Sequence, residues 1–220
     1  MGELAVVVVL GVVSGAIVTI AARRLSDLYL MPADGAVARV DRGILRPEQL
    51  VAGGLVLACY YLHGYGMAFL HGVVFSCLMV VVASVNTRTP IIPNVVTIPG
   101  IVLGFCISPF GGPGFLNSIL GALLGGGLSL VLAELYLRIT SREGLGMGVV
   151  KLLAVVGAFL GWRLVALTMV LAAVSASVVG FATAGRREST ALAFGPFVSG
   201  AAIVAAIFGD RMIRWYFSSW

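Results

Sequence analysis

The sequence predicts an all-helical, multi-pass membrane protein that forms a single integral membrane domain over residues 1–220. Of its 220 residues, 60% are hydrophobic and only 10% are charged, whereas a soluble domain carries about 25% charged residues. The mean hydropathy is +1.10. So few ionic groups cannot cover a soluble surface, and these observations exclude a soluble enzyme, a disordered chain and a fibrous chain.

Eight apolar runs are candidates for membrane spans. A hydrocarbon core about 30 Å thick needs roughly 20 apolar residues per helix. The second and sixth runs are short, and each would have to tilt or begin below the interface. The runs cover residues 4–22, 50–62, 67–85, 95–110, 115–137, 149–162, 164–183 and 191–208.

The distribution of arginine and lysine predicts that both termini lie on the non-cytoplasmic side. With the N-terminus outside, eleven basic residues fall in inside loops and three fall outside, as the positive-inside rule requires. The longest cytoplasmic loop, residues 23–48, has a balanced charge and is expected to be a small polar cap. The basic residues are scattered among apolar runs and form no basic face, so no nucleic-acid partner is expected.

Several residues within the apolar runs have structural interpretations. Cys59, Cys77 and Cys106 show no metal-ligand spacing, so neither a zinc site nor a disulfide is expected. Glu134 precedes Arg138 by four residues, and the two are expected to pair along one helix face. Small residues that would let helices approach closely are Gly121, Gly125, Gly126 and Gly127. His63 and His71 flank a short outside turn and are expected to have no functional role.

Two segments on the expected cytoplasmic side have the character of an active site. Residues 86–100 leave the third run, turn at Pro93 and Asn94, and lead into the fourth. Residues 142–154 join the fifth and sixth runs, and three alternating glycines give this segment a mobile backbone that leads directly into a helix.

These segments resemble the type IV prepilin peptidase family, the membrane aspartic peptidases of pilus and type II secretion systems. The family patterns are Asp, six residues, Pro-Asn or Pro-Asp, then Thr-x-Pro, and Gly-Met-Gly-Asp-x-Lys-Leu. The matching residues are Pro93, Asn94, Thr97, Pro99, Gly146, Met147, Gly148, Lys151 and Leu152. Further matches at 157–162 and 194–197 extend the resemblance over nearly the whole chain. The resemblance implies a prepilin-peptidase-like helical bundle in the bacterial inner membrane.

The resemblance also implies a reaction that this sequence does not support. Family members cleave the leader of type IV prepilins or pseudopilins at the cytoplasmic membrane edge with two aspartates, one acting as base toward water and the other as acid toward the amide. In this sequence Asn86 and Val149 stand at the two aspartate positions. Neither side chain can act as a general base, so the chain is expected to be catalytically inactive.

The second departure from the family is the loop 23–48, which contains no cysteine. Many family members bind zinc through four cysteines there and also methylate the new N-terminus. Neither zinc nor any other cofactor is therefore expected.

Several alternatives remain open on the sequence alone. The chain is either a natural relative that lost catalysis or an active peptidase inactivated by substitution. A small membrane transporter and a structural pilus-assembly partner are other functions that the sequence permits. The expected partners are a prepilin or pseudopilin leader and the lipid bilayer, and the oligomeric state is left open.

Overall fold

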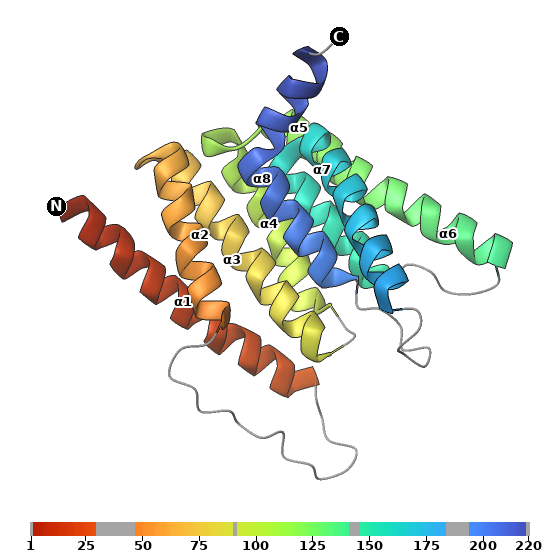
Figure 1. Cartoon of the computed structure of the whole chain (residues 1–220), viewed down its shortest axis with the longest axis horizontal. Helices are drawn as coiled ribbons and strands as arrows, with labels where there is room; N and C mark the ends of the chain where they lie inside the picture. Colours follow the sequence, from red (N-terminus) through yellow and green to blue (C-terminus); the bar gives the residue numbers. More distant parts are fainter. Residues whose placement is uncertain (1, 30–46, 90–91, 141–145, 184–193, 219–220) are drawn as a thin grey trace.

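The computed structural model of the chain describes residues 2–29, 47–89, 92–140, 146–183 and 194–218, and these residues are almost entirely helical (Figure 1). The elements in chain order are α1 (Gly2–Tyr29), α2 (Pro47–His63), α3 (Met67–Arg88), α4 (Asn94–Gly111), α5 (Phe115–Ala122), the π-helical segment η1 (Leu123–Leu128), α6 (Ser129–Thr140), α7 (Met147–Thr183) and α8 (Gly195–Ser218). The described residues contain no β-strand, and the predicted all-α fold is confirmed.

Six stretches of the described chain are long and apolar enough to cross a membrane, which confirms the predicted multi-pass membrane protein. Seven of the eight expected runs lie in helices, and the eighth, 191–208, lies in α8 from Gly195 onward, while its residues 191–193 lie outside the described residues. Two features differ from the expectation. The run 50–62 lies in α2, which has only 17 residues. The runs 149–162 and 164–183 lie in one continuous element, α7.

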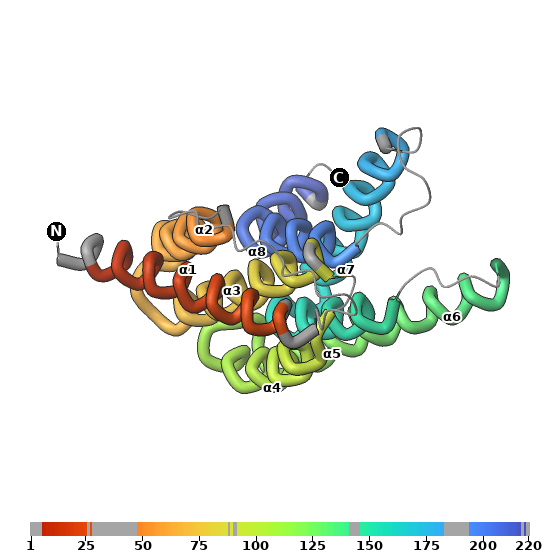
Figure 2. The backbone as a smooth tube through the Cα atoms, turned by 90° about the horizontal axis from the view of Figure 1, so that it is seen from below, coloured from red at the N-terminus to blue at the C-terminus, as the bar shows by residue number. Residues whose placement is uncertain are grey.

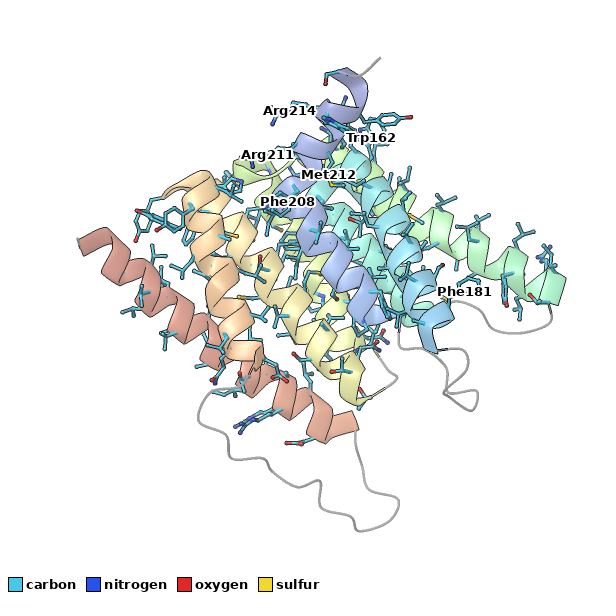
Figure 3. All side chains as sticks on the ribbon, viewed as in Figure 1. Trp162, Phe181, Phe208, Arg211, Met212 and Arg214 are labelled. Carbon is cyan, nitrogen blue, oxygen red and sulfur yellow. The ribbon has the colours of Figure 1, made fainter. Side chains whose placement is uncertain are left out.

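α7 consists of two arms that meet at Gly161. This glycine has φ 77° and ψ 177°, a backbone conformation that only glycine adopts readily. Trp162, directly after the turn, and Phe181, near the end of the second arm, lie at opposite ends of the bundle (Figure 3). The chain therefore reverses direction at a single residue, with no loop between the expected sixth and seventh spans.

α5, η1 and α6 form one continuous rod that packs against the first arm of α7 through small residues. A Cβ atom at Gly121 would collide with the backbone of Gly157, and one at Gly125 would collide with the carbonyl oxygen of Leu153. The expected close helix packing is confirmed at these positions. α6 then extends away from the other helices (Figures 1 and 2), and most of its apolar side chains are exposed.

The main apolar core lies between α3, α7 and α8. Its largest fully buried side chains are Phe75, Met79, Leu152 and Phe159. A second buried cluster joins α1, α2 and α3. α7 contacts α4, α5, η1 and α8, so its two arms form the centre of the bundle.

α1 is longer than the first apolar run. It continues to Tyr29, so the first seven residues of the expected loop 23–48 are helical, and its last two, Pro47 and Glu48, begin α2. The remainder of that loop, 30–46, lies outside the described residues.

Candidate active site

Both sequence motifs lie at the same end of the helix bundle, where α3 ends and where α4, α7 and α8 begin. We call this the motif end. The opposite end holds the turn between α2 and α3, the turn between α4 and α5, and the reversal at Gly161 (Figure 1). Three contacts at the motif end join segments that are far apart in the sequence. They are Asn86 with Gly195, Asn94 with Lys151, and Ile92 with Gly148.

Asn86, which stands at the first aspartate position, is a buried structural residue. It lies in the last turn of α3 and is 5% exposed. Its Oδ1 accepts a hydrogen bond of 3.1 Å from the backbone N–H of Gly195, the first residue of α8, and its Nδ2 donates to the Thr89 carbonyl oxygen at 3.5 Å. A Cβ atom at position 195 would lie 2.5 Å from Asn86 Oδ1, so this contact requires glycine.

The Pro93–Asn94 turn begins α4 as expected. Pro93 is the N-cap residue with φ −66° and ψ 130°, and its carbonyl oxygen accepts hydrogen bonds from the backbone N–H of Val96 and of Thr97. Asn94 Oδ1 accepts a hydrogen bond of 2.9 Å from Lys151 Nζ. The only lysine of the chain therefore connects the two motif segments directly.

The glycine segment 146–148 places the start of α7 against the residues that precede α4. The Gly146 carbonyl oxygen accepts from the Val149 N–H at 2.9 Å, which begins the helix. Met147 is the first residue of α7 and is 58% exposed. A Cβ atom at Gly148 would lie 2.9 Å from the Ile92 Cβ, so the two segments touch at this glycine.

Val149, at the second aspartate position, belongs to the main apolar core. It is 7% exposed and lies in the same buried cluster as Ile92, Leu152 and Val198. Val82, one turn before Asn86 on α3, belongs to the same cluster. Positions 86 and 149 therefore border one core, but the side chains that occupy them bring an amide and an aliphatic group.

Two other carboxylates that the structure describes, Glu134 and Asp210, lie away from positions 86 and 149. Glu134 Oε1 accepts from Arg138 Nε at 2.9 Å on the exposed surface of α6, so the expected pairing is confirmed. Asp210 lies in the second half of α8, towards the opposite end. Glu143 lies outside the described residues. Within the described part of the chain, no group of three or more His, Cys, Asp or Glu side chains could hold a metal ion.

Comparison with known proteins identifies the family. Residues 73–181, which contain both motif segments and both arms of α7 up to Phe181, match the type IV leader peptidase family. Through this segment the chain is similar to the type IV leader peptidase family. The resemblance predicted from the motifs is confirmed.

Curated relatives of the chain carry the name prepilin leader peptidase/N-methyltransferase. The protein of Aeromonas salmonicida is 29% identical over 161 residues, which are 70% of this chain and 54% of that protein. The Pseudomonas putida protein is 32% identical over 126 residues, which are 56% of this chain and 44% of that protein. The Pseudomonas aeruginosa protein is 32% identical over 130 residues, which are 57% of this chain and 45% of that protein. The chain thus spans about half the length of the curated relatives it matches. No solved structure matches it.

Sequence reasoning missed two contacts at the motif end. The bond from Gly195 to Asn86 joins residues 109 positions apart. Its only sequence signal is the segment 194–197, which the motif comparison did select. The contact of Ile92 with Gly148 has no signal beyond the small size of the glycine.

Proposed function

We propose that the chain is a multi-pass protein of the bacterial inner membrane that binds the leader region of a type IV prepilin or pseudopilin and does not cleave it. The observation that carries this proposal is the 2.9 Å hydrogen bond between Lys151 Nζ and Asn94 Oδ1. It joins the two family motifs as one unit at the motif end, although both acid–base positions lack a carboxyl group. Recognition and catalysis are therefore separated in this chain.

The chemistry at positions 86 and 149 supports the loss of cleavage. Peptide hydrolysis by an aspartic dyad needs one carboxylate to take a proton from water and one carboxylic acid to protonate the amide nitrogen. The Asn86 amide does not titrate near neutral pH, and its Oδ1 already accepts the Gly195 N–H. Val149 has no polar side-chain atom and is packed among apolar residues.

A retained binding role is consistent with the apolar character of the motif end. A prepilin leader ends in a short basic segment and a glycine, and an apolar helix follows. Such a helix could lie against the bundle within the membrane, where van der Waals packing between helices is the main source of affinity. The substitution of a carboxylate by Val149 removes a group that would need water or a partner there.

The test is a binding and cleavage assay with the purified chain in nanodiscs. One probe is a prepilin with its intact leader, and the control probe is the same pilin without the leader. We expect tighter binding of the leader-bearing probe and no cleavage product above background. Equal affinity for both probes would exclude leader recognition, and cleavage by the unmodified chain would show that other groups perform the chemistry.

A further inference from the structure

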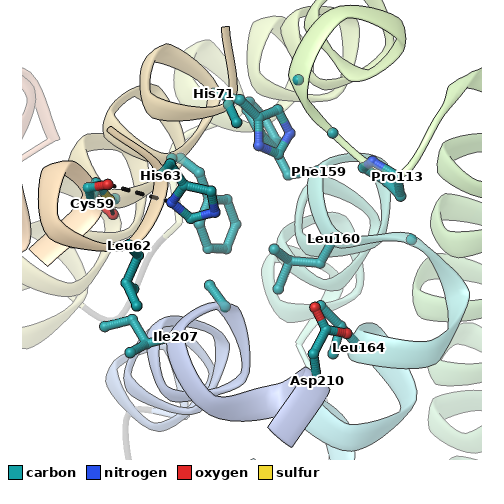
Figure 4. Close-up of a pocket in the computed structure, with 18 of the residues that line it drawn as sticks. Cys59, Leu62, His63, His71, Pro113, Phe159, Leu160, Leu164, Ile207 and Asp210 are labelled. Carbon is teal, nitrogen blue, oxygen red and sulfur yellow. Dashed lines mark hydrogen bonds between the residues drawn. The ribbon is translucent and has the colours of Figure 1, made fainter. Parts of the chain in front are cut away.

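A cavity of about 490 Å³ lies at the opposite end of the bundle from the motif end (Figure 4). Its walls come from α2, α3, α7 and α8 and from the turn between α4 and α5. Small-molecule sites usually have volumes of about 300–1,000 Å³. None of the residues of the two motif segments, 86–100 and 142–154, lines this cavity, so it is separate from the candidate active site. Residues 159–162, which lie within the further family match at 157–162, do line it.

One buried polar group of the cavity is His71 on α3. Its side chain is 8% exposed, and its ring lies against Phe159 with a centroid distance of 5.2 Å. The Nε2 atom is buried and has no hydrogen-bond partner in the protein. A Cβ atom at Gly112 would lie 2.8 Å from this nitrogen, so only a glycine leaves room beside it. An unpaired buried ring nitrogen is unfavourable, and a ligand that bonds to it would remove that penalty.

Two other side chains present hydrogen-bond acceptors to the cavity. His63 Nδ1 lies 3.3 Å from the Cys59 carbonyl oxygen. Since a carbonyl oxygen only accepts, Nδ1 carries the proton in this contact, and Nε2 is the acceptor atom of that tautomer. Asn117 Nδ2 donates to the Pro113 carbonyl oxygen at 2.9 Å, which leaves the amide Oδ1 free to accept. A ligand that matches these groups must donate hydrogen bonds.

Asp210 adds a negative charge to this set of acceptors. Its carboxylate and the His63 ring face the cavity from opposite walls (Figure 4). Among the contacts of the described residues, no cation pairs with this carboxylate, and the nearby Arg214 Nε donates to the backbone carbonyl oxygen of Asp210 at 3.2 Å. The aromatic rings of Phe75 and Phe159 line the same space and favour a cation over their faces.

One positive charge lies in the cavity wall and restricts the ligand further. The Arg163 guanidinium carbon lies 5.3 Å from the ring centroid of Trp162, so this charge is held beside the indole. It would attract an anionic group of the ligand, while Asp210 attracts a cationic one. The cavity therefore matches a ligand that carries both charges.

We propose that this cavity binds an organic primary ammonium group that is linked to a nearby anionic group, with phosphoethanolamine as the simplest example. The ammonium N–H groups donate hydrogen bonds to the Asp210 carboxylate and to ring nitrogens of His63 and His71. The anionic group of the ligand faces the Arg163 guanidinium. This chemistry occurs both in a free phosphoethanolamine and in the headgroup of phosphatidylethanolamine. None of the groups that carry the proposal is needed for leader binding at the motif end, so the two proposals stand or fall separately.

The experiment is isothermal titration of the full chain in nanodiscs made of phosphatidylglycerol. The probes are O-phosphoethanolamine and a short-chain phosphatidylethanolamine, and phosphocholine is the comparison because its quaternary ammonium has no N–H to donate. Asp210→Asn removes the charge at an exposed position where folding should be unaffected. His71→Phe keeps the ring contact and removes Nε2. Glu134→Gln is the matched control, since it removes a carboxylate on α6, away from the cavity.

We expect the dissociation constant of phosphoethanolamine to rise about tenfold or more in Asp210→Asn, because a charge-assisted hydrogen bond is lost. His71→Phe should raise it about threefold or more, and Glu134→Gln should leave it unchanged. Binding of the free compound identifies a soluble ligand, and binding of the short-chain lipid alone identifies a lipid headgroup. The proposal is wrong if neither probe binds, if phosphocholine binds as tightly, or if Asp210→Asn behaves like Glu134→Gln.

Discussion

The side-chain oxygen of Asn86 accepts a hydrogen bond of 3.1 Å from the backbone N–H of Gly195 and thereby joins the end of α3 to the start of α8. The residue at the first aspartate position is thus a buried structural contact. This gives it a measurable role that does not depend on catalysis.

The Asn86→Ala variant should be less stable by about 1–3 kcal/mol, because a buried backbone N–H loses its partner. Thr87→Ala is the matched control: Thr87 is exposed, its Oγ1 bonds only within α3 to the Ser84 carbonyl oxygen, and a change of less than about 0.5 kcal/mol is expected. The measurement is the free energy of unfolding in mixed micelles. Equal stability of the two variants would show that the bond to Gly195 contributes nothing.

The double variant Asn86→Asp with Val149→Asp should cleave a prepilin leader, since the motif residues around both positions are present. Either single variant should stay near background, because one carboxyl group cannot divide the acid and base roles. We expect the double variant to be roughly 100-fold or more faster than either single variant, as measured by leader release from a purified prepilin.

A folding control is needed for that experiment. Val149 is 7% exposed within the main core, and a carboxylic acid there costs about 1–3 kcal/mol even when it stays protonated. Thermal melting must therefore show that each variant is folded before activity is compared. A folded double variant without activity would mean that the site differs from an active one at more than these two positions.

Gly125→Ala should destabilise the bundle, whereas Gly127→Ala, two residues later, should not. A Cβ atom at position 125 would collide with the Leu153 carbonyl oxygen of α7, while one at position 127 meets nothing within 4 Å. We expect a loss of about 1–3 kcal/mol for the first change. The second should be neutral or stabilising by up to about 1 kcal/mol. Similar unfolding free energies for both variants would contradict this packing.

The motif end should face the cytoplasm. Met147→Cys, at a position 58% exposed, should react with a membrane-impermeant thiol reagent only from the cytoplasmic side. Tyr65→Cys, at a position 47% exposed in the turn between α2 and α3, should react only from the other side. The three native cysteines are first replaced by alanine. Labelling of each site from the wrong side would reverse the orientation predicted from the charges. Labelling of both sites from one side would contradict a bundle whose two ends face opposite sides of the membrane.

The helices could be predicted well because each contains an apolar run whose ends are marked by polar residues, proline or glycine. The run 67–85 lies within α3 (Met67–Arg88), and the run 95–110 lies within α4 (Asn94–Gly111). The turn at Gly161 could not be predicted, because the apolar sequence continues through it and only the positive φ reveals the reversal.

Contacts between segments that are far apart in the chain also could not be predicted from the sequence. The motif positions could be selected from their patterns, but the bond between Asn86 and Gly195 depends on how α3 and α8 pack. The same holds for the cavity at the opposite end. His63 and His71 are near each other in sequence and were assigned no role, and their relation to Asp210 exists only once α8 has folded against α3 and α7.

Because α7 reverses direction at Gly161, a rotation of its first arm about this turn moves the far end of the arm most. Position 149 lies twelve residues from this glycine, a distance of about 18 Å at the helical rise of about 1.5 Å per residue. A rotation of about 5° at the turn therefore moves position 149 by about 1.6 Å, a shift comparable to the difference between a hydrogen bond and no bond. A change at the outermost point of α7 would thus have its largest effect at the motif end, where position 149 lies.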